Sequence, residues 1–121
     1  MTNSAITMAI DIKKHRIRLH KNTLHMLLDP KYIQLLINTE KKQIAIKGLD
    51  TMTSGDQTYN IDAGNICTDE SCDIYSDNLV KALYFLVETL DFKSTYRLTG
   101  QLIKSHRLVL FDLSTLERIE G

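Results

Sequence analysis

A short stretch near the start of the chain gathers basic side chains of the kind that contact phosphate. This basic strip consists of five lysines and arginines, namely Lys13, Lys14, Arg16, Arg18 and Lys21. Arg16 and Arg18 alternate with apolar residues, which predicts an extended segment that presents both side chains on one face at intervals of about 6.6 Å. A helix beginning just after it would add exposed amides and a positive helix end, which also favour phosphate. The alternative interpretation is an edge strand whose charges prevent aggregation.

The charges of the chain separate along the sequence, although its formal net charge is zero. Residues 13–47 hold nine lysines and arginines against two acids, which gives +7, whereas residues 50–91 hold nine acids against one lysine, which gives −8. Such a separation predicts a basic face and an acidic face, suited to nucleic-acid contact or to head-to-tail self-association. Alternatively, the charges are spread over solvated faces, because neighbours in sequence need not be neighbours on the folded surface.

The histidines lack the spacing of a metal site. His15, His20 and His25 recur every five residues, so the first two would point to opposite faces of a strand and the third would lie on a helix. The usual helical pair four residues apart and a Cys-x-x-Cys unit are both missing. The acidic stretch at residues 69–73 lacks the pattern of a calcium loop. We therefore predict no metal and no cofactor.

A catalytic arrangement is also missing from the sequence. Cys67 and Cys72 enclose the acidic sequence TDES, whose carboxylates disfavour a reactive thiolate. Their spacing permits a disulfide, but in a reducing compartment we expect free thiols. The glycines are too scattered to form a phosphate-binding loop. We therefore predict a protein that is not an enzyme.

Length and composition indicate one globular domain over residues 1–121. A chain of 121 residues can bury most of a core without disulfides or metal ions to stabilise it. Its composition, with 43% hydrophobic and 25% charged residues, is ordinary for a globular protein. No apolar run approaches the about 20 residues that a membrane span needs, and the N-terminal sequence lacks a signal-peptide pattern. We expect a cytoplasmic protein without membrane contact.

Apolar periodicity predicts the elements that position the basic residues. Period-two alternation over residues 6–12 and 16–20 predicts two strands. A helix of about two turns follows, and Pro30 excludes its continuation. The apolar runs at residues 32–38 and 43–48 then predict a hairpin.

A second series has the same order. After a polar connection at residues 49–71, Ser76 can cap a helix that ends near Asp91, and two strands follow on either side of residues 104–106. Gly100 within the first of these strands predicts a bulge or a close backbone approach. The apolar stripe of this helix consists of Leu79, Val80, Leu83, Val87 and Leu90.

The two series together predict an α+β fold. They occupy about residues 13–48 and 72–113, and we interpret them as an internally duplicated β-α-β-β unit. Two amphipathic helices would then pack on an antiparallel sheet. At an offset of 55, Leu19, Leu24 and Leu28 align with Ile74, Leu79 and Leu83.

The sequence RIRLHKNTLHMLLDPKYIQLLINTEKKQIAIKG resembles the AbrB and MraZ-type swapped-hairpin regulators over about one third of the chain. In those proteins a basic strand-to-helix entry precedes a leucine-bearing turn and two strands. His20 stands where they usually carry proline, and residues 29–31 lack their glycine-rich turn. The resemblance implies that Arg16, Arg18 and Lys21 are DNA contacts.

The doubled β-α-β-β order is also similar to one domain of a DNA sliding clamp and to the saddle of the TATA-box-binding protein. Both resemblances imply association with DNA. This chain lacks the repeated domains of a complete clamp, so a clamp-like role implies a homodimer or a higher assembly. Its zero net charge departs from the basic saddle protein.

These observations predict a DNA-associated or regulatory module that is not an enzyme and uses the basic strand-to-helix edge. The alternative is a protein-interaction module, in which the acidic connection or the exposed edges bind a protein and no nucleic acid is involved. The salt dependence of DNA binding separates the two, because phosphate contacts release counterions.

Overall fold

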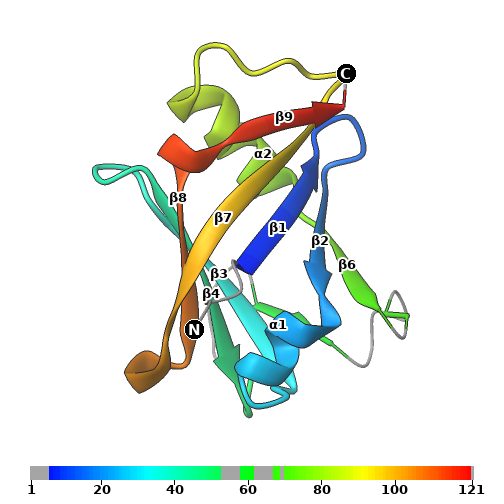
Figure 1. Ribbon diagram of the computed structural model, residues 1–121, viewed down its shortest axis with the longest axis vertical. Helices are drawn as coiled ribbons and strands as arrows, with labels where there is room; N and C mark the ends of the chain where they lie inside the picture. The colour runs from blue at the N-terminus through cyan, green and yellow to red at the C-terminus, as the bar shows by residue number, and fades with distance from the viewer. Residues whose placement is uncertain (1–5, 53–57, 62–66, 69, 121) are drawn as a thin grey trace, which may run out of the picture.

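One antiparallel sheet organises the chain (Figure 1). The computed structural model describes residues 6–52, 58–61, 67–68 and 70–120. In this part of the chain the sheet has the order β5-β3-β4-β8-β7-β1-β2-β6, and β9 also pairs with β7. The strands are β1 (Ile6–Asp11), β2 (Arg16–His20), β3 (Tyr32–Asn38), β4 (Gln43–Leu49), β5 (Thr58–Asn60), β6 (Ser71–Tyr75), β7 (Thr95–Ile103), β8 (Leu108–Asp112) and β9 (Glu117–Glu120).

Two α-helices lie near opposite ends of this sheet (Figure 1). Helix α2 (Asp77–Leu86) is capped by Ser76, whose hydroxyl accepts a hydrogen bond from the Leu79 amide at 3.2 Å. Helix α1 (Lys21–Met26) has six residues and no side-chain cap. Short 3-10 turns, η1 (Lys104–His106) and η2 (Leu113–Thr115), follow β7 and β8.

The predicted fold class is wrong. Two amphipathic helices packed on a sheet were expected, in a clamp-like, saddle-like or swapped-hairpin arrangement, but about half of the described residues are in strands and the sheet curls into a nearly closed, barrel-like shape. The physical reason is long-range pairing. Strand β2 pairs with β6, β4 pairs with β8, and β1 lies between β2 and β7, so both halves of the chain build one continuous sheet.

The predicted internal duplication is not supported either. Only α2, with ten residues, exceeds two turns, whereas α1 is cut short by a turn in which Leu28 and Asp29 have left-handed φ angles of 65° and 48°. A helix cannot continue through such residues or into the following Pro30. Strands β1 and β9 lie outside both predicted copies.

The core lies inside the curved sheet, because buried and more exposed residues alternate along β1, β2, β6 and β8. In β1 and β8 every second residue is buried, as the period-two pattern predicts for β1. Each fully buried aliphatic side chain stabilises the fold by roughly 1.5–3 kcal/mol. The largest fully buried side chains are Phe111, Met8, Ile10, Ile12, Ile17, Leu19, Leu27, Ile33, Ile44, Ile46, Leu79 and Leu83.

Gly100 allows β7 to pass close to β8. A Cβ atom at this position would lie 2.7 Å from the Phe111 ring and 2.8 Å from the Leu110 carbonyl oxygen. The predicted close approach at Gly100 is therefore confirmed. Strand β7 also changes neighbours along its length, since residues 95–97 pair with β9 and residues 100–103 pair with β8.

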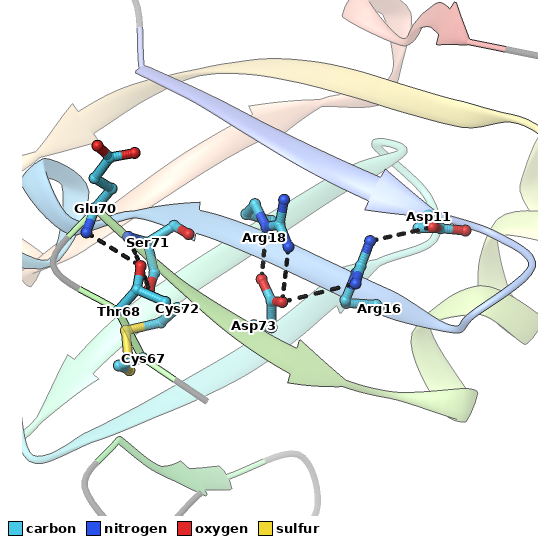
Figure 2. A network of polar contacts seen from close by, with 9 residues as sticks. All are labelled: Asp11, Arg16, Arg18, Cys67, Thr68, Glu70, Ser71, Cys72 and Asp73. Carbon is cyan, nitrogen blue, oxygen red and sulfur yellow. Dashed lines mark hydrogen bonds and ion pairs between the residues drawn. A yellow bond between two sulfur atoms is a disulfide. The ribbon is translucent and has the colours of Figure 1, made fainter. Parts of the chain in front are cut away.

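The two cysteines form a disulfide, so the prediction of free thiols is wrong. Cys67 and Cys72 lie opposite each other in an antiparallel bridge (Figure 2). The turn between them is held by Thr68, whose hydroxyl accepts hydrogen bonds from the amides of Glu70 and Ser71. This turn brings the cysteines together at a Cα separation of 4.0 Å.

Candidate functional site

The two arginines of β2 are paired with acidic residues, although Arg18 is also exposed to solvent (Figure 2). Arg18 donates hydrogen bonds from Nε and Nη2 to the two carboxylate oxygens of Asp73, at 2.7 and 2.9 Å. Arg16 donates from Nη2 to Asp11 at 3.3 Å, and its Nη1 lies 3.8 Å from Asp73. Two of the five predicted DNA contacts are therefore held in ion pairs.

The ion pairs of Arg16 and Arg18 shift the pKa of Asp73, and the Asp73 pair also shifts the pKa of Arg18. The hydrogen bond from Arg18 holds the pKa of Asp73 below its ordinary value of 3.8, and the charges of Arg16 and Lys14 act in the same direction. The same hydrogen bond raises the pKa of Arg18. Asp73 is consequently a carboxylate at neutral pH and neutralises part of the positive charge of the basic strip.

Strand register explains why these charges meet. Arg18 of β2 stands directly opposite Asp73 of β6, and Arg16 stands opposite Tyr75. The basic first half of the sequence and the acidic second half are thus neighbours across one strand pair. The charge separation along the sequence therefore brings opposite charges together at β2, where both arginines are in ion pairs.

The outer face of the adjoining strands is balanced in the same way. Arg97 of β7 pairs in register with Ala9 of β1, which in turn pairs with Arg18 of β2. The guanidinium of Arg97 donates to the Glu117 carboxylate of β9. Each arginine of this cross-strand row therefore has its own carboxylate, so the row carries no excess positive charge.

The three predicted lysines lie around this cluster. Lys13 and Lys14 are exposed in the turn between β1 and β2, where the Lys14 amide donates to Asp11 at 3.2 Å. Lys21 begins α1, and its backbone amide donates to the Glu70 carbonyl at 2.7 Å. Within the described ranges, none of the three ammonium groups is in an ion pair. They are spread over a turn and a helix start instead of forming one strip.

A second surface, which the sequence did not predict, lies where α2 ends. It is a groove of about 890 Å³, lined by Lys41, Lys42, Phe85, Leu86, Val87, Glu88, Asp112, Leu113 and Ser114. Phe85 is 83% exposed, the largest exposed fraction among the apolar side chains of the described residues. Leu113 is buried. The groove therefore combines an apolar lining with charged residues.

Helix geometry places Phe85 in solvent. Leu79, Val80 and Leu83 bury one face of α2. Phe85 follows Leu83 by two residues, which is about 200° around the helix, so its ring is directed away from the core. The helix ends at Leu86, where the Val87 backbone becomes extended.

The segment after α2 is fixed by contacts that compete with further helix. Tyr96 accepts a hydrogen bond from the Asp91 amide at 2.8 Å, and the Asp91 carboxylate accepts from the Lys93 amide and the Ser94 hydroxyl. Such local side-chain bonds offer the backbone an alternative to helix. The predicted helix end near Asp91 is therefore wrong by five residues. Glu88 consequently lies beyond the helix, on the wall of the groove.

The other wall is the turn between β3 and β4 together with η2. Lys42 has a left-handed φ of 54°, and its carbonyl accepts from the Leu113 amide at 2.9 Å. The Asp112 carboxylate accepts from the Ser114 amide at 2.9 Å, and this bond lowers the pKa of Asp112. Lys41 and Lys42 thus lie on one wall and Glu88 on the other.

Two further kinds of site concern the described residues, a metal centre and a membrane span. No group of three or more histidine, cysteine, aspartate or glutamate side chains gathers there closely enough to hold a metal ion. No helix in the same residues has the length and apolar character needed to cross a membrane.

No protein family matches the chain, and comparison with curated proteins and with solved structures finds no match. The resemblances to swapped-hairpin regulators, to a sliding-clamp domain and to the TATA-box-binding protein therefore stay predictions.

Proposed function

We propose that this chain is a protein-interaction module that binds its partner in the groove at the end of α2. The observation that carries the proposal is the 83% exposure of Phe85 at a groove that also contains Leu86 and Val87. Burying an exposed phenylalanine side chain contributes roughly 1.5–3 kcal/mol. Aromatic residues in such pockets are typical anchors of protein interfaces.

Neighbouring side chains support the same surface. Tyr84 and Phe92, on and just after α2, are also exposed, and the ammonium group of Lys93 lies 5.6 Å from the centre of the Phe92 ring. An exposed phenylalanine in a groove that has further apolar lining favours a binding surface over a solvated one. A hydrophobic centre with charged residues around it is also the usual anatomy of an interface.

The DNA-associated alternative has weaker support. Phosphate groups would have to compete with Asp73 and Asp11 for the guanidinium groups of Arg16 and Arg18. That competition costs the ion pairs already formed and reduces the number of counterions released on DNA binding. The protein-interaction function is therefore preferred.

Photo-crosslinking tests the proposal. A benzoylphenylalanine residue replaces Phe85 in one variant and Lys104 in a control variant, since Lys104 is exposed in η1 at a distance from α2 (Figure 1). Both are irradiated in cells that express the chain, and mass spectrometry identifies the joined peptides. We expect a defined protein adduct from position 85 and none from position 104. No adduct at position 85, or the same adducts from both positions, would overturn the proposal.

A further inference from the structure

We infer that the protein bound in the groove is a second copy of this chain, related to the first by a two-fold axis. The inference rests on the proposed function, because it names the partner of the same groove. Three features support it: the charges of the two walls, the apolar centre and the net charge of the whole chain.

The charges of the groove are self-complementary. Lys41 and Lys42 lie on the wall formed by the turn between β3 and β4, and Glu88 lies on the wall that follows α2. Asp112 also lines the lysine side, where its carboxylate accepts a hydrogen bond from the Ser114 amide. In a two-fold interface the same surface occurs on both copies, so each residue pair is formed twice. The lysine wall of one copy can therefore face Glu88 of the other, and the reverse pair forms by symmetry.

These charged groups are available for such pairing. Within the described ranges, neither Lys41, Lys42 nor Glu88 takes part in an ion pair of its own chain. In this they differ from Arg16 and Arg18, whose carboxylate partners lie on the same chain. Opposite charges that face each other across an interface guide the encounter and fix the register of the two surfaces.

The apolar centre provides the contact area that a dimer needs. Phe85 lines the groove together with Leu86 and Val87, and two further aromatic residues near it in the sequence, Tyr84 and Phe92, have exposed fractions of 44% and 57%. Aromatic side chains bury about 150–250 Å² each. Phe85 and the apolar residues beside it therefore contribute part of the roughly 600–1,000 Å² per partner that a stable interface buries.

The net charge of the chain also favours self-association. The formal charge is zero at pH 7, so two copies experience no overall repulsion. Chains near zero net charge associate more readily than chains of high charge. A partner of strong single-sign charge is disfavoured, because lysine and glutamate line the same groove.

A charge-swap experiment tests the inference on the full chain. One variant carries Lys41→Glu and Lys42→Glu, and a second carries Glu88→Lys. Sedimentation velocity over a concentration series measures the dimer dissociation constant of each variant alone and of an equal mixture. We expect the wild type to dimerise, each variant alone to dimerise at least tenfold more weakly, and the mixture to recover wild-type affinity. Only contact between two copies through these walls predicts that recovery.

Matched variants exclude trivial causes. Lys13→Glu with Lys14→Glu makes the same change of charge on another exposed turn, and we expect it to leave the dissociation constant unchanged. Thermal unfolding followed by circular dichroism verifies that each variant is folded. A Phe85→Ser variant should be monomeric at concentrations where the wild type is dimeric.

Three outcomes would overturn the inference: a wild type that is monomeric up to about 100 µM, single variants that still dimerise normally, or a mixture that does not recover. None of these removes the proposed function, which falls only if position 85 gives no specific adduct in cells. An adduct between position 85 and a different protein would retain the interaction module and contradict the second copy.

Discussion

Arg18 of β2 and Asp73 of β6 are joined by two hydrogen bonds of 2.7 and 2.9 Å across one strand pair. The pair links the basic and acidic halves of the sequence. Because β6 is the last strand of the sheet order, this contact also helps to hold a sheet edge in place. A paired arginine with two parallel hydrogen bonds is better ordered than a single-contact ion pair.

Removing the acidic partner should lower stability. We expect Asp73→Asn to reduce the free energy of unfolding by about 1 kcal/mol, because the variant loses the charge that both Arg16 and Arg18 approach. Urea unfolding at pH 7 measures the difference. Glu40→Gln is the control, since Glu40 is exposed in a turn, and it should change stability little. Equal stability of Asp73→Asn and wild type would show that the pair contributes nothing.

The same pair should give a pH dependence of a definite sign. Arg18 lowers the pKa of Asp73 in the folded protein below its ordinary value of 3.8. The contribution of Asp73 is therefore fully present above about pH 4 and is lost as pH falls through the lower folded pKa. We expect the stability difference between wild type and Asp73→Asn to be constant from pH 5 to 8 and to shrink below pH 4. A difference that instead grows on acidification contradicts this linkage.

DNA binding remains a prediction with a direct test. Since Arg16 and Arg18 are paired with carboxylates, we expect the wild type to bind duplex DNA weakly, with a dissociation constant no lower than about 10⁻⁴ M at physiological salt. The double variant Arg16→Glu and Arg18→Glu should leave the salt dependence of binding unchanged. Titrating labelled duplex at several salt concentrations measures the slope. A steep slope that flattens in this variant would restore the basic strip as a nucleic-acid interface.

The turn after α1 should depend on Arg107. Its Nε donates to the Leu27 carbonyl at 2.8 Å, and its Nη2 donates to the Leu28 carbonyl at 3.2 Å and to Asp50 at 2.9 Å. Arg107→Gln keeps much of the side-chain volume but loses the charged fork, so we expect a loss of about 1–2 kcal/mol. Denaturant unfolding measures it. Asp50→Asn removes the charge of one of the three acceptors, and a loss as large as that of Arg107→Gln would argue against the role of the two carbonyls.

Local elements were more predictable than their assembly. The period-two pattern identified β1 and β2, and the cap at Ser76 identified the start of α2. The pairing of β2 with β6 joins residues more than 50 positions apart, and no local periodicity records it. For this reason the sequence predicted two helices packed on a sheet, whereas the structure has one continuous sheet.

The candidate groove was missed for a related reason. Phe85 lies off the apolar stripe of α2, which is the signal that it faces solvent, but the groove exists only because η2 and the turn before β4 lie beside it. The predicted helix also ran on to Asp91, but hydrogen bonds of Asp91 with Tyr96 and Ser94 hold the backbone there in a non-helical conformation. Those contacts depend on tertiary structure.

The disulfide between Cys67 and Cys72 is, after the Arg18 pair, a second contact that holds β6 at the edge of the sheet. Cys67 and Cys72 close a loop of only a few residues, for which the loop-closure relation gives about 2 kcal/mol. We expect a reducing agent to lower the free energy of unfolding by about this amount in the wild type and not at all in the Cys67→Ala, Cys72→Ala variant. Alkylation under native and reducing conditions should label no cysteine before reduction and both after it.

Because Cys72 precedes Asp73, reduction should also loosen the Arg18 contact, and the pH dependence attributed to Asp73 should weaken in the reduced protein. Labelling of both cysteines without reduction would contradict the disulfide and leave the hydrogen bonds of Thr68 to hold this turn.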